Sequence, residues 1–165
     1  MEPQWHVIHV LSRTEKKVAE RLEKKGIIIY LPIQKQLRQW SDRKKWVEMV
    51  ALSGYVFVKI SNKDHLQVLQ TPGVSRFLKH NNVPVYISDL ELQRFRDFVE
   101  KAADSLIEFS AEKLPVGTFI TIQTGRFKGF SGEVVEHKGK CKLTVELSNF
   151  GHFFVVLSSS DVLPQ

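Results

Sequence analysis

Residues 53–60 (SGYVFVKI) constrain the fold more than any other stretch of this sequence. β-Branched and aromatic residues alternate behind Gly54, a pattern typical of a strand. Alternation places Val56, Val58 and Ile60 on one face, and Tyr55, Phe57 and Lys59 on the other. The first face is a plain core face. The second is too aromatic to be left to water, so another part of the chain covers it or it contacts a partner.

The composition indicates a globular chain of one domain or two small ones. It has 165 residues, of which 42% are hydrophobic, and charges interrupt every long segment, so no transmembrane span is expected. The N-terminus lacks a basic region followed by an apolar one, and we expect no signal peptide. The single cysteine, Cys141, excludes an intramolecular disulfide framework. These features predict a cytoplasmic monomer that needs no metal or cofactor and does not contact membranes.

The charge is unevenly distributed along the chain. Residues 1–103 hold 18 Lys and Arg against 11 Asp and Glu, whereas residues 104–165 hold 6 against 7. A basic excess favours association with polyanions and says nothing about the fold. The asymmetry therefore suggests two units with different partners.

The N-terminal part begins with a predicted strand, residues 4–11, which is followed by a helix over residues 13–26. Val18, Ala19 and Leu22 form the apolar stripe of that helix, and Gly26 is placed to end it. Arg21, Lys24 and Lys25 lie near its end. They belong either to a solvated face with i,i+4 ion pairs or to a ridge that faces phosphates.

Two tryptophans flank a basic loop in the next segment. Residues 27–39 predict a strand that Pro32 bends or confines to an edge, and Ser41-Asp42 suits the tip of a hairpin. Trp40 and Trp46 are expected to face each other across that tip. Basic residues interleaved with aromatics suit single-stranded nucleic acid, and a cross-strand Trp pair that steadies the hairpin explains them equally well.

The remaining segments complete the predicted architecture. Residues 63–70 predict a short helix with Leu66 and Leu69 inward, and Ser88 with Glu91 forms a capping box before a longer helix. The core positions of that longer helix are Leu92, Phe95, Val99 and Ala102. Residues 1–103 thus predict an α+β sandwich, an antiparallel sheet with helices. Residues 104–114 lack a period and are assigned to a linker. Residues 115–165 predict a small β-barrel with strands at 118–123, 132–135, 142–147 and 153–157.

Both halves resemble a known family. Residues 116–122 and 124–134, with the glycines Gly125, Gly129 and Gly132, resemble the KOW motif of NusG-type transcription factors, and residues 149–152 resemble the end of that barrel. We expect the three glycines to permit a tight positive-φ turn. Residues 5–11, 30–32, 53–58 and 71–74 resemble the NusG N-terminal domain in the same order. The resemblance implies a five-stranded SH3-like KOW barrel at the C-terminus.

The resemblance also implies a function and partners. In the family, the N-terminal domain binds the clamp helices of the largest RNA polymerase subunit through an exposed hydrophobic concavity and suppresses pausing or termination. The matching positions are Val7, His9, Tyr55 and Phe57, of which His9 departs from the usual large hydrophobe. The KOW barrel recruits a ribosomal protein or Rho. Its matching positions are Phe127, Phe150 and His152.

Three features of this sequence resemble those of the specialised paralogues RfaH and UpxY, which act on selected operons such as those for surface polysaccharides. They are the short N-terminal domain, its basic first helix and the compact linker. RfaH reads the non-template DNA strand, and Arg21, Lys24 and Lys25 match the region that it uses. The C-terminal domain of RfaH can refold as a helical hairpin. Here the β-branched residues favour strands, so we expect a stable barrel.

Two other classes of function compete with this interpretation. The alternative is a ribosome-associated KOW protein that binds RNA. Such a protein should have a basic barrel, whereas residues 104–165 of this chain hold 6 Lys and Arg against 7 Asp and Glu. An enzyme is disfavoured because His6 and His9 lie on opposite faces of one strand and Cys141 has no placed partner. The sequence also shows no phosphate-binding loop, nucleophile elbow or paired carboxylates.

Overall fold

The computed structural model describes residues 2–103, 105–110, 117–123, 125–137 and 140–157. These residues form two compact units. One comprises residues 1–33, 50–92 and 148–150, and the other comprises residues 34–49, 93–147 and 151–165. This grouping differs from the division into residues 1–103, 104–114 and 115–165, which remains a prediction.

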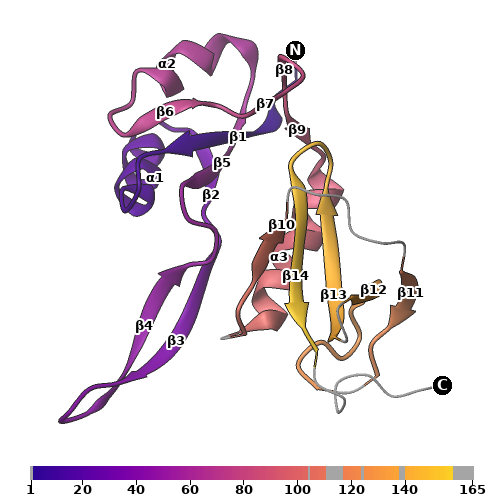
Figure 1. The fold of residues 1–165 in the computed structure, drawn as a ribbon. Helices are drawn as coiled ribbons and strands as arrows, with labels where there is room; N and C mark the ends of the chain where they lie inside the picture. The colour runs from indigo at the N-terminus through magenta and orange to yellow at the C-terminus, as the bar shows by residue number, and fades with distance from the viewer. Residues whose placement is uncertain (1, 104, 111–116, 124, 138–139, 158–165) are drawn as a thin grey trace. The chain divides into compact units, whose positions relative to one another are not determined.

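An antiparallel sheet forms the centre of the first unit (Figure 1). Its strand order is β2-β5-β1-β6, and β9 also pairs with β1. The strands are β1 (Gln4–Val10), β2 (Ile28–Tyr30), β5 (Tyr55–Ile60), β6 (Val74–Phe77) and β9 (Tyr86–Ile87). Since β5 lies between β2 and β1, the stretch that the sequence singles out is a central strand.

Helices cover the aliphatic face of this sheet. They are α1 (Glu15–Lys24) and α2 (His65–Leu69), the latter preceded by the 3₁₀ turn η1 (Asn62–Asp64). The core joins Val18 and Leu22 of α1 to Val56, Val58 and Ile60 of β5, as alternation predicts. The prediction for α2 is wrong: Leu66 and Leu69 are exposed and Val68 is the buried residue. The helix is only five residues long, so one buried side chain is sufficient to fix its orientation.

Two smaller antiparallel sheets each contain two strands. One pairs β3 (Ile33–Gln39) with β4 (Lys44–Val50), and the other pairs β7 (Lys79–His80) with β8 (Val83–Pro84). The break between β2 and β3 falls at Pro32, where the sequence predicts a bend. The tip of the β3–β4 hairpin is Ser41-Asp42, as predicted.

The second long helix, α3 (Asp89–Ala102), has the predicted start and core face. The backbone N–H of Ser88 donates to the Glu91 carboxylate over 3.2 Å, and that of Glu91 donates to Ser88 Oγ over 3.1 Å. This is the capping box. All four predicted core positions are buried, namely Leu92, Phe95, Val99 and Ala102.

The C-terminal residues form strands, as predicted, in an antiparallel sheet with the order β10-β14-β13-β12-β11. The strands are β10 (Glu108–Ser110), β11 (Thr118–Thr121), β12 (Ser131–His137), β13 (Lys140–Leu147) and β14 (Gly151–Val156). Residues 108–110, assigned to the linker from the sequence, pair with β14. Residues 104 and 111–116, which include other parts of the predicted linker and the start of the KOW-like segment, lie outside the described residues. So does Thr124. A closed SH3-like barrel remains a prediction.

The KOW-like turn depends on its glycines in two different ways. Gly125 and Gly129 have φ angles of 82° and 86°, as the predicted tight turn requires. Gly132 does not have a positive φ angle. A Cβ atom there would lie 2.9 Å from the ring of Phe130 and 3.0 Å from Leu143. Gly132 therefore provides packing space, and the prediction of a positive φ angle at that position is wrong.

Candidate functional site

The candidate partner-binding face is the side of the first sheet opposite α1. Strand register places its residues in rows across β2, β5 and β1. Tyr30 pairs with Phe57 and Phe57 with Val7 in one row, and Tyr55 pairs with His9 in the next. The register therefore brings the four positions predicted to bind the polymerase (Val7, His9, Tyr55 and Phe57) onto one face.

These four positions differ in exposure. Val7 and Phe57 are fully buried, whereas His9 and Tyr55 are half-buried. Phe57 lies in the middle of the sheet with a neighbour on each side, and its ring centroid is 5.8 Å from that of Tyr30. The expectation that Val7 and Phe57 lie outside the core is therefore wrong in this structure, because alternation sorts faces and does not tell how each face is covered.

His9 and Tyr55 form the accessible part of the predicted site. Their rings meet edge to face, with centroids 5.3 Å apart. On β2, Ile28 is 59% exposed and Tyr30 is half-buried. Because Ile28 pairs with Lys59 and Tyr30 with Phe57, both side chains lie on this same face. Sequence reasoning did not include these two residues, although the dense Ile27-Ile28-Ile29-Tyr30 run was a signal for them.

The basic side chains of α1 are engaged within the first unit. Arg21 Nη1 donates to the carbonyl of Pro72 over 2.8 Å, and Lys24 Nζ lies 3.3 Å from Glu20 four residues earlier. Lys25 Nζ donates to Thr71 Oγ1 over 2.8 Å and to the Gln67 carbonyl over 3.2 Å.

These contacts define what the three side chains do in this structure. Arg21 and Lys25 fasten α1 to the segment between α2 and β6, and Lys24 makes the i,i+4 pair of a solvated face. A role of Arg21, Lys24 and Lys25 in contacting nucleic acid remains a prediction.

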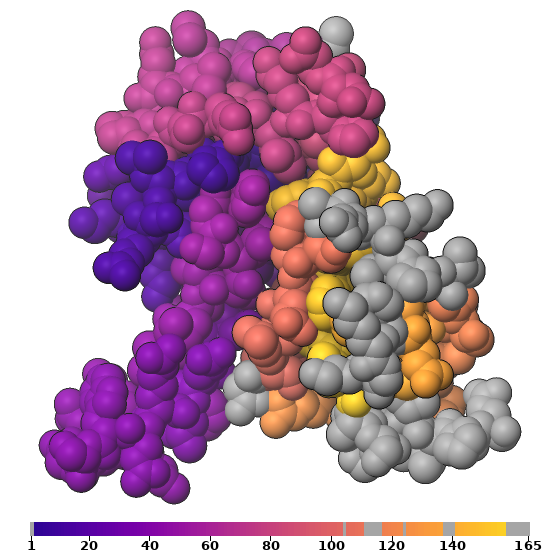
Figure 2. Space-filling model, in the orientation of Figure 1, coloured from indigo at the N-terminus to yellow at the C-terminus, as the bar shows by residue number. Residues whose placement is uncertain are grey.

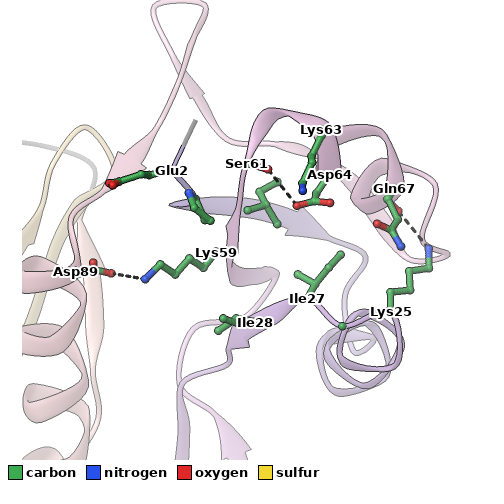
Figure 3. Close-up of a pocket in the computed structure, with 13 residues that line it drawn as sticks. Glu2, Lys25, Ile27, Ile28, Lys59, Ser61, Lys63, Asp64, Gln67 and Asp89 are labelled. Atoms are coloured by element: carbon green, nitrogen blue, oxygen red, sulfur yellow. Dashed lines mark hydrogen bonds and ion pairs between the residues drawn. The ribbon is translucent and has the colours of Figure 1, made fainter.

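Lys25 also lines a pocket of about 720 Å³ in the first unit (Figure 3). Lys59 and Lys63 add two more ammonium groups to its lining, and Glu2, Asp64 and Asp89 add three carboxylates. Lys59 pairs with Asp89 over 3.3 Å, which Figure 3 marks with a dashed line. Equal numbers of opposite charges give the pocket no strong preference for an anion.

The three positions predicted to bind a partner of the KOW domain also differ in exposure. Phe127 and Phe150 are buried and His152 is half-buried. The Phe127 ring lies 5.8 Å from Phe98 and 6.3 Å from Phe130, within the aromatic core of the second unit. Phe127 therefore packs this core, and a role in partner binding remains a prediction for all three residues.

A cluster of aromatic rings surrounds His6 on the helix-covered side of the first sheet. The ring centroid of His6 lies 4.8 Å from that of Tyr86, 5.7 Å from Phe77 and 6.1 Å from His65, which stacks on Phe77 at 3.8 Å. His6 Nδ1 donates to the Gln4 carbonyl over 2.9 Å, which leaves Nε2 as the atom that gains a proton.

Burial lowers the pKa of both histidines below the ordinary value of 6.5. For His6 the main cause is desolvation, to which the neighbouring His65 adds, while the bond to Gln4 acts in the opposite direction. Desolvation and the charge of Lys79 lower the pKa of His65. The folded state therefore resists protonation of this cluster.

We expect the first unit to lose stability as the pH falls below about 6.5. The unfolded chain takes up protons there at the ordinary histidine pKa, whereas the folded chain resists them, so the free energy of unfolding decreases. Urea denaturation between about pH 5.5 and 7.5 measures this slope, which His6→Gln should reduce. His80→Gln, at an exposed histidine of β7, is the control. An equal slope in the His6 variant would contradict the prediction.

Two kinds of feature are missing from the described residues. No helix in them is long and apolar enough to cross a membrane. Within the same ranges, no cluster of three or more His, Cys, Asp or Glu side chains has an arrangement that could hold a metal ion.

Sequence comparison assigns residues 3–96 to the NusG model, described as "Transcription termination factor nusG". The transcription termination/antitermination protein NusG of Rickettsia prowazekii is 28% identical over 163 residues, covering 90% of this chain and 82% of that protein. The NusG protein of Staphylococcus epidermidis is also 28% identical, over 89% of this chain and 87% of its own length.

A structural comparison supports the same fold. The structure titled "Domain interaction in Thermotoga maritima NusG" matches with a TM-score of 0.53 at 24% identity, covering 98% of this chain and 96% of that one. An antiparallel sheet with helices, followed by a second antiparallel sheet, defines a two-part α+β protein. The chain belongs to the NusG family, whose members are transcription factors and not enzymes.

Proposed function

We propose that this chain is a transcription elongation and antitermination factor that binds RNA polymerase through the exposed part of its first sheet. Membership of the NusG family supports the assignment to transcription. The observation that carries the polymerase contact is the half-exposed pair of His9 and Tyr55, on the same sheet face as the exposed Ile28. Large apolar and aromatic groups at the centre of an interface contribute most of its binding energy.

The partner that fits this face is a pair of coiled-coil helices, the clamp helices of the largest polymerase subunit. Helices present ridges of aliphatic side chains, against which Tyr55 and Ile28 would pack. The factor would suppress pausing or termination on selected operons, and its C-terminal sheet, closed as a KOW barrel, would recruit a ribosomal protein or Rho. His152 is the accessible candidate for that second contact.

We expect Tyr55→Ala to weaken binding to purified bacterial RNA polymerase by on the order of tenfold, since a central tyrosine contributes about 1–2 kcal/mol or more. Because Tyr55 is half-buried, the variant should retain its fold, which Phe57→Ala is not expected to do. Biolayer interferometry measures the affinity. In vitro transcription on several leader templates should show a parallel loss of pause suppression.

The matched control is Tyr86→Ala, which removes an exposed tyrosine from the opposite face of the same sheet, where it pairs with His6. That variant should bind polymerase like the unmodified chain. Unchanged binding of Tyr55→Ala, or an equal loss in both variants, would refute the assigned face. Recovery of ribosomal RNA in place of polymerase subunits from a lysate would favour the ribosome-associated alternative.

A further inference from the structure

The β3–β4 hairpin has a register that sorts its side chains into two chemically different faces. The backbone N–H of Trp40 donates to the Arg43 carbonyl over 2.8 Å, and that of Ala51 donates to the Pro32 carbonyl over 2.9 Å. Counting from either bond gives the same register, which sets Trp40 opposite Arg43. The predicted pairing of Trp40 with Trp46 is therefore wrong: the two indoles lie on opposite faces of the hairpin.

One of these faces, here called the Trp40 face, concentrates positive charge around an exposed indole. Arg38, Arg43 and Lys45 lie on it by register. The guanidinium carbon of Arg43 lies 5.7 Å from the centre of the Trp40 ring, and Lys45 Nζ lies 5.8 Å from it, both within the range of cation–π attraction. Trp40 is 45% exposed, so the ring remains open to a ligand.

The opposite face is less suited to an anion. Trp46 is 62% exposed and borders a hollow of about 510 Å³ that Lys35 and Glu48 also line. The Glu48 carboxylate beside Trp46 repels phosphates and offsets the charge of Lys35. Lys44 is the other cation on this face by register. The Trp40 face carries three cations and no acid, so it has the stronger attraction for a polyanion.

We propose that the Trp40 face binds single-stranded DNA, with a base stacked on Trp40 and phosphates on Arg38, Arg43 and Lys45. An indole stacks on any base, provided that the base is unpaired, and adjacent cations then follow the backbone. The β3–β4 sheet pairs with no other described strand, and residues 37–46 around its tip are all exposed; the hairpin is visible as the purple arm in Figure 2.

DNA fits this face better than RNA does. The two acidic residues of the hairpin are Asp42, in the turn, and Glu48, on the opposite face. A ribose 2′-hydroxyl thus finds no carboxylate acceptor on the Trp40 face, whereas a deoxyribose presents an apolar edge to the indole. This contact would be additional to the proposed polymerase contact and does not depend on it.

The test measures fluorescence anisotropy of a labelled oligodeoxythymidine with the full chain in the absence of polymerase. We expect Trp40→Ala to weaken binding by on the order of tenfold, the effect of losing one stacked base. Trp46→Ala removes the more exposed indole from the other face and should leave the affinity unchanged. An equal loss in both variants, or no loss in either, would overturn the proposal.

The neighbouring lysines Lys44 and Lys45 give a second, charge-matched comparison. Lys45→Gln should lower the salt dependence of binding by about 0.7 in the log–log slope, the value for one phosphate contact on a single strand. Lys44→Gln removes the same charge from the opposite face and should leave the slope unchanged. Duplex DNA that binds as tightly as the single strand, or RNA that binds as tightly as DNA, would overturn the assignment.

Discussion

Gly73→Ala is expected to lower the free energy of unfolding by about 3 kcal/mol, because it combines two penalties. The φ angle of Gly73 is 97°, a conformation that an L-residue adopts only with strain. A Cβ atom there would also lie 2.6 Å from Cγ2 of Val18, a fully buried residue of α1. Neither α1 nor the turn before β6 can relax without disturbing the core. Urea denaturation measures the loss.

Gly26→Ala separates the two penalties. Gly26 has a φ angle of 79° at the end of α1, but no atom lies within 4 Å of the position that a Cβ atom would occupy there. Only the conformational cost remains, about 1 kcal/mol. Equal losses of unfolding free energy in the two variants would show that the closeness of Val18 to Gly73 adds nothing to the cost of Gly73→Ala.

Leu22→Ala should also lower the free energy of unfolding by about 3 kcal/mol, within the range for a buried leucine truncated to alanine. Leu22 is fully buried and lies in the core with Val58 and Ile27. The truncation removes apolar contacts between α1 and the sheet and leaves a cavity that the central strands cannot fill. The same denaturation experiment measures the effect.

Lys17→Ala is the matched control on the same helix, since Lys17 is exposed and alanine favours helix. We expect it to change the free energy of unfolding by less than about 0.5 kcal/mol. A loss for Leu22→Ala below about 1 kcal/mol would show that α1 contributes little to holding the first unit together.

The sequence predicted the elements whose periodicity is long and regular. The stripe of Val18 and Leu22, the alternation in β5 and the capping box of Ser88 all rest on local geometry, which sequence spacing determines directly. The five-residue α2 is too short to show a period, and in it Val68 is buried, whereas Leu66 was expected to be. Short elements take their orientation from tertiary packing.

The candidate sites were harder to predict because they depend on what lies across a face. Strand alternation placed Phe57 and Tyr55 on the correct side, but the cover over Phe57 includes the rings of Tyr30 and Phe150, which no local pattern reveals. Likewise, the contacts of Arg21 and Lys25 with residues 67–72 join segments far apart in the sequence. Charge on a helix face alone could not distinguish a fastening role from a binding role.

Because the turn of the β3–β4 hairpin is short, the number of residues in each strand decides which side chains share a face. Residues added in matched pairs, two to each strand, would lengthen the arm and keep every existing side chain on its own side. A single residue added between Arg43 and Lys44 would instead transfer Lys44 and Trp46 to the side of Trp40 and remove Lys45 from it. Among relatives with the same composition in this arm, the parity of its length would decide whether cations and indole act together.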